Sequence, residues 1–108
     1  MRISRIEDMV GGWFVGNFTP AMHRTKDCEV GYKFHPKGDI WAKHYHKIAT
    51  EITFLIKGSM VIQGKTLTSG DIFIILPNEI ADPIFLEDCE VVIVKVPSVI
   101  GDKYEVTD

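Results

Sequence analysis

Short β segments separated by turn residues dominate the sequence, and they constrain the fold more than any other feature. About eight segments carry the β-branched, aromatic and alternating apolar residues that are typical of strands. Gly, Pro, Asn and Asp interrupt the chain between them, as in PKGD at 36–39 and TSGD at 68–71. This spacing predicts an all-β sandwich or barrel and argues against βαβ units. The predicted strands are 13–18, 29–34, 40–46, 51–56, 60–63, 71–76, 80–86 and 90–96.

One segment near the N-terminus has helical features. In SRIEDM, residues 4–9, Ser4 can act as an N-cap, and Glu7 follows at the capping-box spacing. The sequence therefore predicts a short helical segment before the first strand. A length of 108 residues is typical of one domain, and no internal repeat or linker divides the chain. We expect residues 1–108 to form a single domain.

Charge and composition argue against two large classes of function. The formal net charge is −3 and no basic stripe is present, which argues against nucleic-acid binding. No apolar run approaches the roughly 18 residues of a membrane span. The N-terminal MRISRIEDMV lacks the apolar centre of a signal peptide. We therefore expect a cytoplasmic protein.

The two cysteines, Cys28 and Cys89, stand far apart in the sequence and neither belongs to a C-x-x-C pair. Without a secretory signal, two reduced thiols are favoured over a disulfide. A thiolate zinc site has no support. We expect Cys89 to be a core residue rather than a nucleophile.

The predicted strand 51–56 has one fully apolar face, formed by Ile52, Phe54 and Ile56. Residues 72–76 are apolar without a break. Continuous apolar residues are typical of strands that are buried on both faces. A second sheet or another subunit is therefore expected to cover the outer side. The sequence favours a homodimer.

Two histidines one residue apart form the most informative polar pair. His44 and His46 lie at i and i+2, so a single strand can aim both imidazoles at one point. Glu51 can join them if the chain turns through KIAT, residues 47–50, and returns as the neighbouring strand. Two imidazoles and one carboxylate suit iron(II), and they also accept manganese, nickel or zinc. The alternative is ordinary polarity on a strand surface.

The same residues carry a resemblance to a known family. The segment GDIWAKHYHKIATEITFLIKG, residues 38–58, resembles the first motif of the cupins, with Gly38, His44, His46, Glu51 and Gly58 on pattern. The resemblance covers roughly residues 30–96. It implies a small double-stranded β-helix, or jelly roll, with a pocket inside the barrel.

The second cupin motif is similar to SGDIFIILPNEIAD, but in a weakened form. Its anchors are Gly70 and Pro77, with one residue more between them than is usual. Glu79 stands where the family most often has a second Gly, and Leu86 stands where it has Asn. Asp82 occupies the position of the third metal-ligand histidine.

Asp82 leaves two interpretations open. As a fourth ligand it would give two histidines and two carboxylates, a set that favours manganese or iron over copper. As a turn residue before Pro83, it would leave the site weak or empty of metal. In a metal-free site, Asp82 beside Glu51 would be a candidate general acid or base, because two close carboxylates raise one pKa. Asp82 and Glu51 are therefore the catalytic candidates.

Five other aromatic and histidine positions have simpler predictions. His35 and His23 are expected to be solvated, and Trp13 to lie in the core rather than at the barrel mouth. Trp41 and Tyr45 are expected to pack outside the barrel.

The resemblance implies a small metal-binding cupin that acts on or binds a small polar molecule, such as a sugar or an organic acid. An enzyme of this kind would be an isomerase, an epimerase or a dioxygenase. The alternatives are a non-catalytic binding or regulatory domain without metal, and a structural remnant whose pocket has lost its metal. The sequence identifies neither the metal nor the small molecule.

Overall fold

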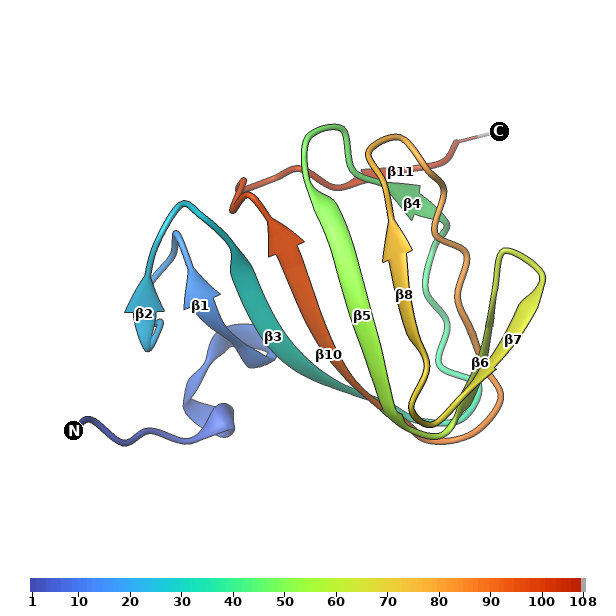
Figure 1. The fold of residues 1–108 in the computed structure, drawn as a ribbon, viewed down its shortest axis with the longest axis horizontal. Helices are drawn as coiled ribbons and strands as arrows, with labels where there is room; N and C mark the ends of the chain where they lie inside the picture. The colour runs from blue at the N-terminus through green and yellow to red at the C-terminus, as the bar shows by residue number, and fades with distance from the viewer. Residues whose placement is uncertain (108) are drawn as a thin grey trace.

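The structure of the chain, a computed structural model, describes residues 1–107, and its regular secondary structure is almost entirely β-strand (Figure 1). The all-β prediction is confirmed. Two short 3-10 turns, η1 (Ile6–Asp8) and η2 (Val10–Gly12), precede the first strand. The strands are β1 (Trp13–Gly16), β2 (His23–Arg24), β3 (Glu29–His35), β4 (His44–Tyr45), β5 (Thr50–Lys57), β6 (Ser59–Ile62), β7 (Lys65–Thr68), β8 (Ile72–Ile75), β9 (Ile84–Phe85), β10 (Cys89–Val96) and β11 (Tyr104–Glu105).

The strands form a large sheet and a smaller layer. The large sheet has six strands in the order β2-β1-β3-β10-β5-β8, and all of its neighbours are antiparallel except β1 and β2. The smaller layer consists of the three strands β7-β6-β9 and the pair β11-β4. In Figure 1 the long strands β3, β10, β5 and β8 lie side by side, with β4 and β11 near the upper end of β8 and β6 and β7 at the lower right.

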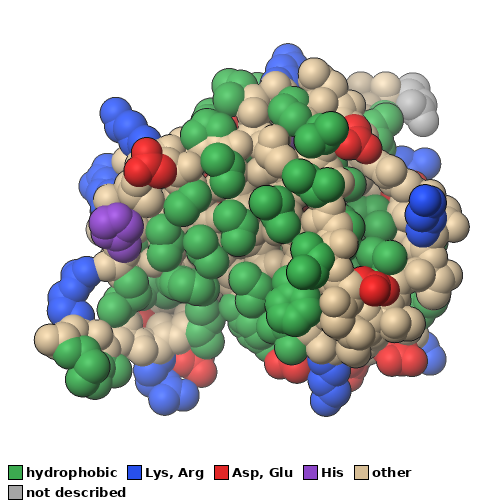
Figure 2. Space-filling view, viewed as in Figure 1, with side chains coloured by type: hydrophobic (Ala, Val, Ile, Leu, Met, Phe, Trp, Pro, Cys, Tyr) green, Lys and Arg blue, Asp and Glu red, His purple; other side chains and the backbone are tan. Residues whose placement is uncertain are grey.

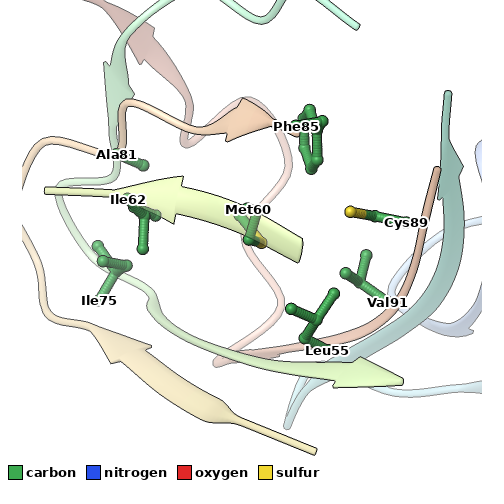
Figure 3. Close-up of a cluster of buried hydrophobic side chains, with 8 residues drawn as sticks. All are labelled: Leu55, Met60, Ile62, Ile75, Ala81, Phe85, Cys89 and Val91. Carbon is green, nitrogen blue, oxygen red and sulfur yellow. The ribbon is translucent and has the colours of Figure 1, made fainter. Parts of the chain in front are cut away.

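Apolar side chains from both layers meet in one core (Figure 3). Leu55, Ile75 and Val91 come from the large sheet, and Met60 and Ile62 come from β6. Burying apolar surface between two layers is what stabilises such a fold. The cluster is completed by Ala81, Phe85 and Cys89. Cys28 and Cys89 are both free thiols, as predicted.

The two faces of β5 have opposite environments. Thr53 and Leu55 are buried toward the core, whereas Phe54 and Ile56 on the other face are exposed. This alternation follows from the two-residue period of a strand. The apolar outer face that the sequence predicted is therefore present, and nothing within residues 1–107 covers these two side chains.

Gly58, the last glycine of the first motif, is required by the backbone where β5 turns into β6. Its φ is +105°, and a Cβ at this position would lie 2.4 Å from the carbonyl oxygen of Asp88. Any side chain would therefore clash with the segment that leads into β10. The glycine allows these two parts of the chain to approach closely.

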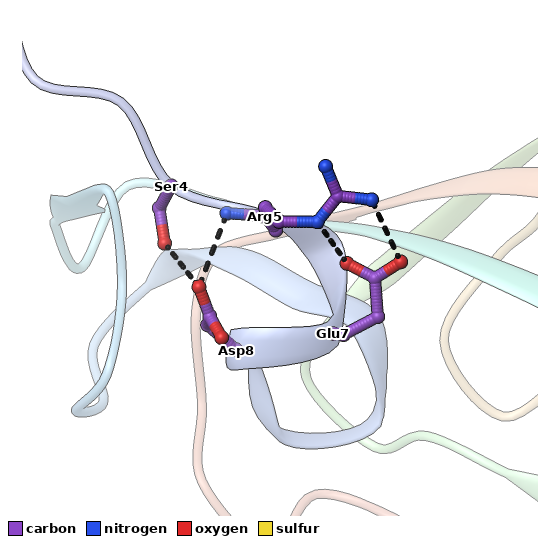
Figure 4. A network of polar contacts seen from close by, with 4 residues as sticks. All are labelled: Ser4, Arg5, Glu7 and Asp8. Carbon is purple, nitrogen blue, oxygen red and sulfur yellow. Dashed lines mark hydrogen bonds and ion pairs between the residues drawn. The ribbon is translucent and has the colours of Figure 1, made fainter.

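The predicted N-terminal helix is replaced by the turns η1 and η2. The Ser4 hydroxyl donates to the carboxylate of Asp8 at 3.3 Å, and Arg5 Nε donates to Glu7 Oε2 at 3.2 Å, so Glu7 does not complete the expected capping box (Figure 4). No residue of η1 is buried. A short helix without a packed face is marginal in water, which explains the difference. No helix among the described residues is long and apolar enough to span a membrane.

Two predicted strands are much shorter in the structure. The segment 40–46 forms only β4 and a single bridge from Ile40 to Ile84, and the segment 80–86 forms only β9 and a bridge from Ala81 to His44. Pro83 cannot donate a ladder hydrogen bond, so it interrupts the second segment. The sequence did not predict β2, β7 or β11, which are short or polar.

Candidate metal centre

The segment containing β4 places two imidazoles inside the molecule. His44 and Ala81 exchange both backbone hydrogen bonds, at 3.1 Å and 2.8 Å, which fixes the position of His44 against the segment before β9. His44 is 8% exposed and His46 is 2% exposed. Both rings therefore point inward. Their i, i+2 spacing predicted that they share one face of the strand. Tyr45 between them stacks against Tyr104 of β11.

Glu51 reaches the histidines from the large sheet. It lies in β5, where it pairs with Lys95 of β10 on one side and Ile75 of β8 on the other. β4 pairs only with β11 among the described strands. The expectation that the chain returns as the strand next to His44 is therefore wrong. The chain crosses from the smaller layer to the large sheet between His46 and Glu51.

Asp102 holds the crossing segment in place. Its carboxylate accepts backbone hydrogen bonds from Lys47 at 3.0 Å, Ile48 at 3.1 Å and Ala49 at 2.9 Å. Burial raises the pKa of Asp102, but the three N–H donors outweigh burial and hold this pKa below its usual value. A carboxylate near the C-terminal end of the described chain thus positions the turn that connects two predicted ligands.

His44, His46 and Glu51 form the group whose geometry fits a metal ion. One potential ligand atom from each residue lies within 4.8 Å of the others. His44 Nδ1 lies 3.0 Å from the carbonyl oxygen of Ala42, so it carries the proton and leaves the Nε2 lone pair available. His46 Nε2 is buried and has no hydrogen-bond partner within the described chain. A buried unpaired nitrogen is costly, and a bound metal ion would satisfy it.

The electrostatic environment keeps His46 neutral. Burial, and then the charges of Lys95 and of His44, lower its pKa to about 4. A neutral imidazole is the form that binds a metal. Lys95, however, also repels a cation and attracts an anion. The site therefore favours either a tightly bound metal ion or an anion.

The three residues line one cavity of about 190 Å³ between the two layers. Apolar side chains from both layers form most of its wall. Three lysines, Lys33, Lys95 and Lys103, also line it. Trp13 and Trp41 face the same space. The expectation that Trp41 packs outside the barrel is therefore wrong, and Trp13 is a wall residue of the cavity rather than a member of the buried core.

Asp82 lies outside the three-residue group. Ala81 is the bridge partner of His44 and lines the cavity, so alternation directs the next side chain away from it. Asp82 Oδ1 accepts the backbone N–H of Gln63 at 2.7 Å. Gln63 in turn donates to Glu79 Oε2 at 3.2 Å. The carboxylates of Glu79 and Asp82 thus hold loops, and the structure does not bring Asp82 to Glu51.

His35 is buried, not solvated as predicted. Its ring stacks on Phe85 with a centroid distance of 4.1 Å, and its Nδ1 lies 2.9 Å from Asp39 Oδ2. The Trp41 indole N–H donates to the same carboxylate oxygen at 2.9 Å. Hydrogen bonds from His35 and then from Trp41 lower the pKa of Asp39. His35 also lines the cavity, and an imidazole that a carboxylate orients can transfer a proton.

Sequence reasoning missed the cavity lysines and His35, although the chain contains a signal for most of them. Lys33 and His35 alternate on β3 in the register of the inward face, and Lys95 continues the inward face of β10 after Val91 and Ile93. Lys103 lies before β11 and has no such pattern.

Comparison with known proteins identifies the fold. A double-stranded β-helix protein from Klebsiella pneumoniae is 21% identical, with a TM-score of 0.73 over 99% of this chain and 93% of that chain. KdgF from Halomonas sp. is 21% identical, with a TM-score of 0.64 over 70% of this chain and 74% of that chain. A cupin-2 domain protein from Shewanella frigidimarina is 17% identical, with a TM-score of 0.55 over 67% of this chain and 72% of that chain.

No protein-family model matches the chain, and no curated protein sequence matches it. The structural likenesses, all at low identity, establish the fold. The chain is an all-β double-stranded β-helix, similar to cupin-2 domain proteins, with a His-His-Glu group that could hold a metal. The predicted fold class is confirmed.

Proposed function

We propose that this protein is a metal-binding cupin-type barrel that holds a small polar molecule in its cavity, with His44, His46 and Glu51 as the metal ligands. The observation that carries the proposal is the buried Nε2 of His46, which lacks a partner within residues 1–107 and lies close to two further donor groups. The cavity beside these residues supplies space for the small molecule.

The donor set limits the metal to a few divalent ions. Two imidazole nitrogens and one carboxylate accept iron, manganese, nickel or zinc. Three protein ligands leave coordination positions open, and oxygens of a small molecule can occupy them. When bound, a divalent ion would polarise a carbonyl or hold such oxygens. The donors now lie within 4.8 Å of one another, so small side-chain rotations bring them to the metal–ligand distances of about 2.0–2.2 Å.

Metal content per chain tests this proposal directly. Protein purified without a histidine tag or chelator is expected to contain close to one equivalent of a single divalent metal by plasma mass spectrometry. His44→Ala and His46→Ala are expected to reduce the metal to background, because each removes one of three ligands. His23→Ala is the matched control, since His23 is exposed on β2 and should change nothing.

Two outcomes contradict the assignment. One is full metal occupancy in His44→Ala or His46→Ala with an unchanged circular dichroism spectrum. The other is a wild-type chain that stays metal-free after incubation with iron, manganese, nickel and zinc.

A metal-free binding protein is the second candidate function. Lys95 lies opposite Glu51 in the sheet register, and both Lys95 and Lys103 line the cavity. Their positive charges disfavour a cation and favour an anionic ligand. If metal analysis gives an empty site, the same cavity would act as a non-catalytic receptor for a small anion.

For an enzyme, the proton-transfer group would be Glu51 or His35 rather than Asp82. Glu51 and His35 line the cavity, whereas the Asp82 carboxylate accepts a hydrogen bond from the Gln63 backbone. Comparing His35→Gln with Asp82→Asn tests this assignment. If Asp82→Asn lost turnover and His35→Gln kept it, Asp82 would be the general acid or base, as the sequence predicted.

A further inference from the structure

Three lysines from separate segments converge on the cavity. Lys33 lies on β3, Lys95 on β10 and Lys103 immediately before β11, and all three line the same space as the His-His-Glu group. Lysine side chains normally extend into water, and burying them costs free energy. Lys33 and Lys95 are half-buried and Lys103 is exposed, so the fold directs three charged side chains toward one cavity, two of them at a desolvation cost.

Aromatic rings hold the ammonium groups in place. Lys33 Nζ lies 5.1 Å and Lys95 Nζ lies 4.9 Å from the centroid of the Trp13 ring, so the two ammonium groups are at most about 10 Å apart. Lys103 Nζ lies 4.3 Å from the centroid of Trp41. Contacts of a cation with an aromatic face restrict the lysine without neutralising its charge.

The cavity is lined by more positive than negative side chains. Glu51, itself a proposed metal ligand, is the one carboxylate among the described residues that line the cavity. Within residues 1–107 no carboxylate forms an ion pair with any of the three lysines. Burial, and then the charges of the neighbouring lysines, lower the pKa of Lys33 and of Lys103. The charges of Glu51 and Glu105 act on Lys103 in the opposite direction. The ammonium groups thus repel one another, and no carboxylate within residues 1–107 pairs directly with any of them.

We infer that Lys33, Lys95 and Lys103 form an anion subsite, and that the small molecule of this cavity is an organic acid whose carboxylate they bind. The inference deepens the proposed function, since it names the chemical class of the ligand at that site. A carboxylate accepts charge-assisted hydrogen bonds from several ammonium groups and relieves their repulsion. Phosphate would meet the same charges, so the test must separate the two anions.

The position of Lys95 connects the anion subsite to the metal group. Lys95 and Glu51 are paired residues on β10 and β5, and side chains of such pairs have Cβ atoms about 4.5–5.5 Å apart. A 2-hydroxy acid or a sugar acid can therefore place its carboxylate near Lys95 and a second oxygen near His44, His46 and Glu51. The cavity of about 190 Å³ accommodates a molecule of this size.

Matched pairs of small molecules isolate the contribution of the carboxylate. D-glucuronate and D-glucose differ at one carbon, and lactate and propane-1,2-diol differ in the same way. In calorimetric titrations, at least one acid is expected to bind about tenfold or more tightly than its neutral counterpart, the effect of a hydrogen bond to a charged group. Equal binding of acid and neutral molecule in both pairs would overturn the inference, and so would inorganic phosphate binding more tightly than either acid.

Substitution of each lysine by methionine removes the charge and keeps an unbranched side chain. Lys33→Met, Lys95→Met and Lys103→Met are each expected to weaken binding of the acid about tenfold. Lys65→Met is the matched control, since Lys65 is exposed on β7 and does not line the cavity. Unchanged acid binding in all three cavity variants would refute the subsite.

Lys95→Met separates loss of charge from damage to the fold. The lysine repels a cation at His46, so its removal is expected to tighten metal binding while it weakens acid binding. A misfolded variant would lose both.

The same titrations on metal-free protein distinguish this inference from the proposed metal site. Preference for the acid without any metal would support the anion subsite even if metal analysis had failed. Stoichiometric metal binding without preference for either acid would support the metal site and refute the anion subsite.

Discussion

Gly31 illustrates how a single absent side chain shapes the cavity. A Cβ at this buried position of β3 would lie 2.6 Å from the six-membered ring of Trp13. The indole therefore lies directly over Gly31, where the ammonium groups of Lys33 and Lys95 contact the ring. The cavity wall and the orientation of two lysines depend on this missing side chain.

Gly31→Ala is expected to reduce the free energy of unfolding by about 1–3 kcal/mol, the usual cost of overpacking a buried position. The added methyl group must displace the Trp13 ring. Chemical denaturation measures the change. In a Trp13→Ala background the ring is gone, so the same substitution should cost much less. Equal costs in both backgrounds would show that the clash with Trp13 is not the cause.

At the scale of an element, the turn between His46 and Glu51 decides whether the ligands meet. The turn crosses between two sheets and has no strand partner of its own, so its three backbone N–H groups need another acceptor. Asp102 provides it through hydrogen bonds to Lys47, Ile48 and Ala49. The position of Glu51 relative to His46 therefore depends on a residue about 50 positions later in the chain.

Asp102→Asn is expected to lower metal affinity about 10- to 100-fold, the usual effect of losing a group that orients the ligands. It should also reduce the free energy of unfolding by about 2 kcal/mol at neutral pH, because a charged acceptor is lost. The metal is measured by competition with a chelator, and stability by denaturation. Retained metal affinity would show that the turn holds its shape without the carboxylate.

The pH dependence of this effect has a definite sign. The pKa of Asp102 is lower in the folded chain than its usual value. Ionised Asp102 therefore contributes its full stabilisation of the fold above the unfolded pKa of about 3.9. This stabilisation disappears as the pH falls through the folded pKa. The stability difference between wild type and Asp102→Asn should therefore be constant near neutrality and shrink below about pH 4.

At the scale of the whole molecule, the outer face of the large sheet is apolar and exposed. The β-ladder pairs Phe54 with Ile72 and Ile52 with Ile74, and Phe34 lies on the same sheet. Phe34, Ile72 and Ile74 are each more than half exposed, at 55%, 68% and 53%. Figure 2 shows hydrophobic side chains gathered across the middle of the molecule in the view of Figure 1. An exposed apolar area of this extent is typical of an interface.

We propose that a second copy of the chain covers this face, because one self-complementary surface is sufficient for a twofold dimer. Light scattering coupled to size-exclusion chromatography is expected to give twice the chain mass. Phe54→Glu and Ile72→Lys should each give a monomer, since a charge at the centre of the interface loses its water. Thr66→Glu, on exposed β7, is the control. A monomeric wild-type protein would refute the dimer.

The sequence by itself determined the features that depend on local patterns. Alternating apolar residues and turn residues define strands one segment at a time, so the all-β fold and most strand positions were predictable. The shared face of His44 and His46 followed from the same two-residue period, and the turn at Gly58 followed from the turn residues KGS at 57–59.

Only the tertiary structure decided how these segments meet. Whether Ala81 or Asp82 faces His44 depends on a register between chain segments far apart, and a shift of one residue reverses the faces. The approach of Glu51 from the opposite layer, the burial of His35 and the convergence of the lysines have the same origin. Local patterns specify which side of a strand a residue occupies, but pairing between distant strands determines which residues share a cavity.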